Sequence, residues 1–98
     1  MTEFLYDLLA SRVRLRILEV LDRAPSSKYN EIARHIPKAS LSKELPILLK
    51  VNLLAFQFIR DARGQYQSPF MAKEYYLTAR GKKVIQTIQT LDKELFNF

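Results

Sequence analysis

The residues best suited to chemistry in this 98-residue chain gather in one short stretch, "KASLSKE", at positions 38–44. Ser40 and Ser42 supply hydroxyls, Lys38 and Lys43 supply ammonium groups, and Glu44 supplies a carboxylate. None of them stands in a recognisable motif that pairs a nucleophile with a base. The stretch therefore indicates binding through hydrogen bonds and ion pairs, and we expect no enzymatic activity.

Metal and redox chemistry lack the residues that they need. The chain has no cysteine, which excludes disulfides and thiolate metal sites, and no cluster of His, Asp or Glu has metal-ligand spacing. We expect no metal and no cofactor. The one histidine, His35, follows an apolar helix face, where a hydrogen-bonded structural role is favoured over a ligand or pH role.

The charge distribution favours a polyanionic partner. The formal net charge is +6, and residues 28–83 contain eleven Lys and Arg against four Asp and Glu, so the whole excess lies in the middle of the chain. A basic surface can serve solubility alone, but its concentration in one stretch favours a binding face. With no run near the roughly 20 apolar residues of a membrane span, we expect one soluble, intracellular domain over residues 1–98.

Apolar spacing and breakers predict the elements that position these residues. Residues 3–23 form one helix, or two that abut near Ser11, and residues 28–36 form a short helix with Ser27 as its cap and Pro37 at its end. The remaining elements are a third helix at about 41–51, strands at 54–60 and 73–78 that form a hairpin, and a helix at about 79–96 capped by Thr78.

The position of Pro46 bears on where the third helix begins. Proline costs about 3 kcal/mol inside a helix but little in its first turn, where the missing amide has no partner. We therefore expect the helix to begin at or near Ser42, with that serine as the cap and the amino end presented outward. A tighter first turn from Ser40 is the alternative.

Three motifs in this order resemble winged helix-turn-helix regulators. "LLASRVRLRILEVL" resembles the first helix of ArsR-type proteins, "LSKELPILLKVNLL" resembles their recognition helix, and "YYLTARGKKVI" resembles the wing exit of PadR, HxlR and MarR-type proteins. The resemblance covers roughly residues 8 to 90 and implies an α+β, mainly α fold with a two-stranded wing. Two residues depart from the pattern: Asn52 replaces a glycine, and Pro46 is unusual in a recognition helix.

The resemblance implies double-stranded DNA as the partner, with the third helix in the major groove and the wing on the backbone or minor groove. The expected DNA-binding residues are Lys28, Lys38, Ser40, Ser42, Lys43, Glu44, Arg60, Arg63, Gln65, Tyr66 and Lys73. Some have structural alternatives: a serine can be occupied as the cap, Lys43 and Glu44 can form a solvated face, and Arg63 can lie in a solvated loop. Glu44 also repels phosphates unless it accepts from a cytosine amine.

The last helix predicts a homodimer. Its apolar residues recur at spacings of four, three, four and three, and they would pack with apolar residues near the amino terminus. The expected interface residues are Phe4, Leu5, Leu8, Val84, Ile88, Leu91, Leu95 and Phe98. Packing of this helix onto the domain's own first helix is the alternative.

Together these features predict a dimeric, cytoplasmic, nucleoid-associated regulator of transcription that favours palindromic DNA. One alternative is a spreading, architectural or DNA-partition protein with little base readout. The other is a protein-interaction module built on the same fold.

Overall fold

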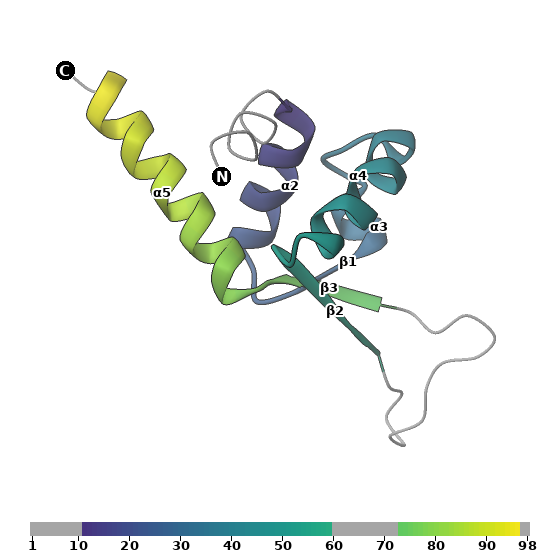
Figure 1. Ribbon diagram of the computed structural model, residues 1–98. Helices are drawn as coiled ribbons and strands as arrows, with labels where there is room; N and C mark the ends of the chain where they lie inside the picture. Colours follow the sequence, from purple (N-terminus) through teal and green to yellow (C-terminus); the bar gives the residue numbers. More distant parts are fainter. Residues whose placement is uncertain (1–10, 60–72, 97–98) are drawn as a thin grey trace.

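The computed structural model describes residues 11–59 and 73–96 (Figure 1). Several predicted site residues lie outside these ranges. They are Phe4, Leu5, Leu8, Arg60, Arg63, Gln65, Tyr66 and Phe98.

The described elements follow the predicted order, with one addition. They are α2 (Arg12–Asp22), β1 (Ser27–Lys28), α3 (Tyr29–Ile32), α4 (Lys38–Lys50), β2 (Leu54–Phe58), β3 (Lys73–Leu77) and α5 (Ala79–Phe96). The addition is β1, which pairs antiparallel with β3, so the sheet has three strands in the order β1-β3-β2 instead of two. A two-residue strand is too short to show an alternating pattern, and Ser27, expected as a helix cap, lies buried in it.

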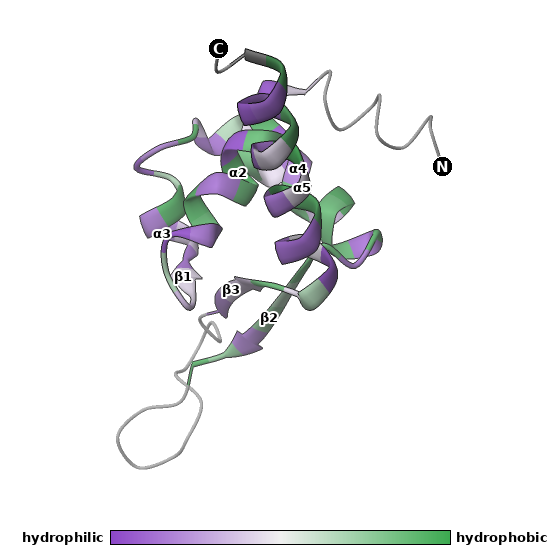
Figure 2. Ribbon diagram, turned by 90° about the vertical axis from the view of Figure 1, so that its left-hand side faces the viewer, coloured by the Kyte–Doolittle hydropathy of each residue, from purple (hydrophilic) through white to green (hydrophobic). Residues whose placement is uncertain are grey.

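One hydrophobic core lies between the helices and the inner face of the sheet. Helix α2 packs against both α4 and α5 and lies between them (Figure 1). The fully buried side chains come from all four described helices and from β2 with the residue before it. They are Ile17, Leu18, Leu21, Ile32, Leu41, Leu48, Leu53, Leu54 and Ile85. The hydrophobic segments drawn in green in Figure 2 alternate with hydrophilic ones along α5. Within the described ranges, no helix is both long and apolar enough to cross a membrane.

Hydroxyl side chains fix the first turns of α2 and α5. Ser11 Oγ accepts from the Arg14 amide at 3.3 Å, so α2 begins at the predicted break. Thr78 Oγ1 accepts from the Gly81 amide at 3.0 Å and donates to the Asn52 carbonyl oxygen at 2.7 Å, which confirms the predicted cap of α5. Asn52 has the expected left-handed backbone, with a φ of 62°.

Gly81 explains why the wing exit needs a glycine. A Cβ built on Gly81 would lie 2.1 Å from the backbone carbonyl oxygen of Leu53. The same oxygen accepts from the Thr78 amide at 3.1 Å, so the strand-to-helix turn packs directly on the end of the α4–β2 connection. Residues 78 and 81 therefore lock α5 to the segment that follows α4.

Two helix boundaries differ from the predictions. Helix α3 ends at Ile32 rather than Ile36, because the Arg34 and His35 amides bond three residues back to Glu31 and Ile32 in tighter turns. His35 is exposed in these turns, so its predicted position on the apolar face of the helix is wrong.

The predicted start of α4 is also wrong. The helix begins at Lys38 after Pro37, whose carbonyl accepts from the Leu41 amide at 2.9 Å. Pro46 consequently lies inside the helix and leaves the Ser42 carbonyl without its usual amide donor. Both residues are exposed, so water can hydrate that carbonyl and reduce the cost.

Candidate nucleic-acid interface

Helix α4 divides cleanly into an inner and an outer face. Its inner face buries Leu41, Glu44, Leu45 and Leu48 against the domain. Its outer face consists of the exposed residues Lys38, Ala39, Ser42, Lys43, Pro46 and Lys50. We call this set the outer face of α4. It contains three lysines and no acid, so its charge suits an anionic partner.

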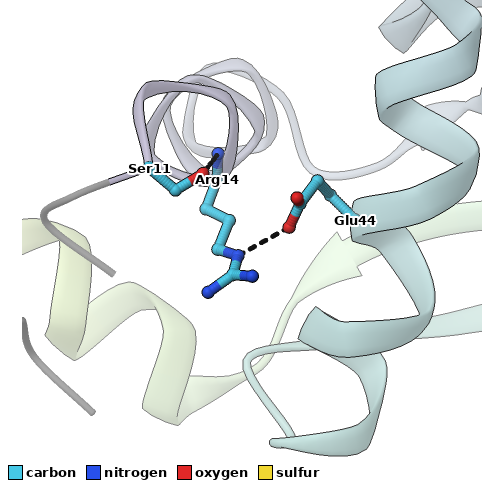
Figure 3. A network of polar contacts seen from close by, with 3 residues as sticks. All are labelled: Ser11, Arg14 and Glu44. Atoms are coloured by element: carbon cyan, nitrogen blue, oxygen red, sulfur yellow. Dashed lines mark hydrogen bonds and ion pairs between the residues drawn. The ribbon is translucent and has the colours of Figure 1, made fainter. Parts of the chain in front are cut away.

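The predicted placement of Glu44 in the groove is wrong. Its carboxylate lies on the inner face, where Arg14 Nε of α2 donates to Glu44 Oε2 at 2.5 Å (Figure 3). The two side chains are only 23% and 12% exposed, and a partly buried carboxylate needs such a partner. Because the one acid of α4 is turned inward, it neither repels an anion at the outer face nor reads a base.

The amino end of α4 is open. Within the described part of the chain, no side chain caps this helix, and its first three amides have no partner inside the helix. Lys38 is exposed in the first turn, and Ser40 is half-buried there and does not act as the predicted cap. The amides without a partner in the helix, the helix dipole and the Lys38 ammonium all favour an anion at this end.

Tyr29 of α3 contacts the outer face of α4. Tyr29 Oη lies 2.6 Å from Ser42 Oγ and 3.3 Å from the Lys38 carbonyl oxygen. Ser42 is therefore hydrogen-bonded although it is exposed, and Lys43 beside it is exposed as well. Lys28 precedes Tyr29 and is also exposed, with its amide donating to Glu31 Oε1 at 3.1 Å.

The hairpin adds a cation over aromatic rings. Lys73 on β3 stands opposite Phe58 on β2, and its Nζ lies 4.5 Å from the centroid of the Phe56 ring. Phe56 is 37% exposed and lies opposite Tyr75, whose hydroxyl pKa is raised by burial and by the electrostatic effect of Tyr29. Lys73 is thus held at the base of the predicted wing and is exposed.

The predicted dimer seam on α5 has two parts. Val84 and Ile88 are half-buried and pack against the domain's own core, as the alternative interpretation of this helix expected. Leu91 and Leu95 lie further along and are 48% and 57% exposed. In Figure 1 this half of α5 extends away from the body, at the opposite end from the hairpin.

Sequence reasoning missed two residues of this surface. Tyr29 is not among the predicted contacts, because its hydroxyl contact with Ser42 spans 13 positions and no local pattern reveals it. Lys50 lies one turn beyond Pro46 on the outer face, and helical spacing from Lys43 could have identified it. On α2, Arg16 pairs with Glu19 at 3.5 Å. The described ranges contain no metal-ligand cluster.

No protein-family model matches the chain, and the search of curated proteins finds no match. Solved structures do resemble it. The reduced form of the transcriptional regulator YodB from B. subtilis has a TM-score of 0.71 and 21% identity, over 96% of this chain and 90% of that one. A PadR family transcription regulator from Clostridium difficile has a TM-score of 0.70 and 16% identity, over 87% of this chain and 91% of that one.

A third neighbour is a putative MarR family transcriptional regulator from Porphyromonas gingivalis, with a TM-score of 0.67 and 22% identity, over 99% of this chain and 91% of that one. At these identities the similarity establishes the fold. The chain has the winged helix-turn-helix fold that its motifs predicted, with structural relatives described as PadR and MarR regulators.

Proposed function

We propose that this protein binds double-stranded DNA and regulates transcription. The observation that carries the proposal is the outer face of α4: it is exposed, basic and open at its amino end, while its acid is paired inward with Arg14. The fold neighbours are described as transcription regulators, which supports the same function. The proposal places the protein in the cytoplasm, on the nucleoid.

The exposed groups divide into phosphate and base contacts. The open amides of α4, together with Lys38 and Lys28, would bind backbone phosphates and set the register of the helix. Ser42 and Lys43, on the same face, would reach base edges in the major groove. Ser40, half-buried in the first turn, would add a hydroxyl near phosphate.

The β2–β3 hairpin would contact the neighbouring sugar-phosphate backbone or minor groove of the DNA. Lys73 is exposed at its base. Arg60, Arg63, Gln65 and Tyr66 stay proposed contacts from the sequence and lie outside the described residues.

A homodimer would complete the reading of DNA. Leu91 and Leu95 are large apolar side chains with about half of their surface exposed at the far end of α5, where a second copy could cover them. A two-fold axis through these helices would present two α4 helices to successive major grooves about 34 Å apart. Charge substitution at Leu91 should shift the protein from dimer to monomer in sedimentation analysis.

A second candidate is sequence-independent coating of DNA, as in spreading or partition proteins. Ala39 and Pro46 occupy central positions of the outer face and offer no hydrogen bond to a base. A face with few long polar side chains favours phosphate contact over base readout.

Titration with duplex DNA separates these functions. The purified protein is titrated with random-sequence duplex and with DNA from around its own gene, each at two salt concentrations, because phosphate contacts alone give steep salt dependence. A regulator should prefer one of its own sites by a factor of about 10³ or more. Equal, cooperative binding to both would support coating, and no binding at low salt would reject DNA as the partner and favour a protein-interaction module.

A further inference from the structure

The core face of the β2–β3 hairpin continues beyond the part that the domain buries. Leu54, Phe56 and Phe58 alternate along this face of β2. Leu54 is fully buried, whereas Phe56 is 37% and Phe58 is 39% exposed, and the two rings meet edge to face with their centroids 5.4 Å apart. Two adjacent aromatic rings that are exposed on one face are a candidate for contact with a ligand.

Phe56 belongs to a row of aromatic side chains that leads toward the outer face of α4. Its ring centroid lies 6.1 Å from that of Tyr75, which stands opposite it on β3. Burial and the electrostatic effect of Tyr29 raise the pKa of Tyr75, so the two phenols lie near each other. Tyr29 in turn is hydrogen-bonded to Ser42 on α4. The exposed rings therefore lie next to the proposed DNA contacts, with Tyr75 and Tyr29 between them.

The charge beside the rings is positive. Lys73 Nζ lies 4.5 Å from the centroid of the Phe56 ring and 5.8 Å from that of Phe58. The next residue of β3, Glu74, is on the opposite face of the sheet, and its carboxylate accepts from Ser26 Oγ at 2.6 Å. In the described part of the hairpin, an anion beside the rings would thus meet an ammonium group and no carboxylate.

This surface matches a ligand that combines a flat ring with a negative charge. A stable protein interface buries about 800 Å² on each partner. Within the described ranges, the other large apolar side chains that are exposed, Leu91 and Leu95, lie on α5 at the opposite end of the molecule (Figure 1). Phe56 and Phe58 therefore do not join a larger apolar patch with them, and a nucleotide supplies both the ring and the charge.

We propose that Phe56 and Lys73 bind an unpaired nucleotide of single-stranded DNA, with the base stacked on the Phe56 ring and the phosphate held by the Lys73 ammonium group. Stacking on an aromatic ring, combined with a cation for the backbone, binds single strands without sequence preference. The ammonium group lies over the ring where a base would stack, and an incoming phosphate would draw it aside. The inference goes beyond the proposed function, because duplex DNA keeps its bases paired and offers none to the ring.

Fluorescence anisotropy with labelled single strands tests the proposal on the complete chain. One strand is an oligothymidylate of about 12 nucleotides, and the other has the same length and charge but abasic sugars throughout. The proteins are wild type, Phe56→Leu and Lys73→Gln. The matched control is Tyr76→Leu, which removes a ring from the opposite face of β3. Leucine keeps an apolar side chain at each position, and thermal unfolding verifies that each variant is folded.

Wild type should bind the thymidine strand about tenfold more tightly than the abasic strand, which is the effect of one stacked base. In Phe56→Leu this preference should fall to about twofold or less, while affinity for random duplex stays within about twofold of wild type. Lys73→Gln should weaken binding to both strands and reduce its salt dependence, because it removes a phosphate contact. Tyr76→Leu should retain the wild-type preference.

The contrary results are distinct from a failure of the proposed function. Equal binding of the two strands by wild type overturns the stacking site, whether or not the protein binds duplex. A preference that Phe56→Leu leaves unchanged, or that Tyr76→Leu loses as much as Phe56→Leu does, overturns the assignment to Phe56. Failure to bind duplex at low salt, together with a tenfold preference that depends on Phe56, would reject the proposed function and leave the single-strand site standing.

Discussion

The first turns of α4 and α5 begin in opposite ways. Helix α5 begins after Thr78, whose hydroxyl accepts from the Gly81 amide and donates to the Asn52 carbonyl oxygen, so this hydroxyl is hydrogen-bonded within the domain. Helix α4 starts after Pro37 without a side-chain cap, and the Ser42 hydroxyl, one turn further along, is hydrogen-bonded to Tyr29 of α3. The hydroxyl at the start of α5 stabilises the fold, while the polar groups at the start of α4 remain available to a ligand.

Polar groups at a helix start can therefore either stabilise the fold or bind a ligand. A capped start contributes about 1 kcal/mol to folding, whereas an open start gives up that contribution and retains amides that can bind an anion. Substitutions near Thr78 should therefore change stability, and substitutions on the outer face of α4 should change binding.

Gly81→Ala should have the largest effect on stability. The added methyl group would meet the Leu53 carbonyl at 2.1 Å, and a backbone oxygen cannot move aside without disturbing the α4–β2 connection. We expect a loss of roughly 3 kcal/mol in the free energy of unfolding, measured by urea denaturation. A loss below 1 kcal/mol would show that the turn is not tightly packed.

Glu44→Ala should have the next largest effect, a loss of about 2 kcal/mol in the free energy of unfolding, because it leaves the Arg14 guanidinium without its partner. The Arg14 side chain is only 23% exposed. The double variant Arg14→Ala/Glu44→Ala should lose less than the sum of the single variants. Additive losses in the same denaturation experiment would indicate that the pair does not couple α2 to α4.

Thr78→Val and Ser42→Ala form a matched pair of hydroxyl losses. Thr78→Val should cost about 1 kcal/mol, since it removes the cap of α5 and its bond to the Asn52 carbonyl. Ser42→Ala should cost less than about 0.5 kcal/mol, because alanine favours a helix and the site is exposed. Equal losses on thermal denaturation would show that the Ser42 hydroxyl stabilises the fold as much as the cap of α5 does.

Tyr75 gives the smallest effect, visible only at alkaline pH. Burial raises its pKa above the unfolded value of 10.0, and the electrostatic effect of Tyr29 adds to the shift. The folded state thus holds this proton more tightly, so its contribution to stability is complete below pH 10 and is lost as the pH rises through the folded pKa. Tyr75→Phe should lose less stability than wild type as the pH rises above 10, whereas parallel curves would exclude Tyr75 as the cause.

Local sequence signals predicted the parts of the fold that depend on neighbouring residues. Thr78 precedes a regular apolar pattern and caps α5 as expected, and Asn52 adopts the left-handed turn that ends α4. These features need only residues within a few positions of one another. The helix order and the winged helix-turn-helix fold followed from such signals and from the three motifs.

The predictions failed where distant residues decide. The signal of a capping serine and an early proline placed the start of α4 at Ser42, but the chain turns at Pro37 and accepts Pro46 inside the helix. Glu44 was assigned to DNA because its partner Arg14 is 30 positions away, and Tyr29 was overlooked for the same reason. Polar side chains on a helix can be assigned to a face by spacing, but their partners require the tertiary structure.

The most direct test of the outer face of α4 compares two charge reversals in DNA binding. Lys43→Glu lies on that face, and Lys93→Glu is a matched change of net charge on exposed α5, off the apolar seam. At low salt, Lys43→Glu should weaken binding to random duplex at least tenfold and reduce its salt dependence, while Lys93→Glu stays within about twofold. Equal weakening by both variants would mean that net charge, rather than α4, attracts the DNA, and would contradict the account.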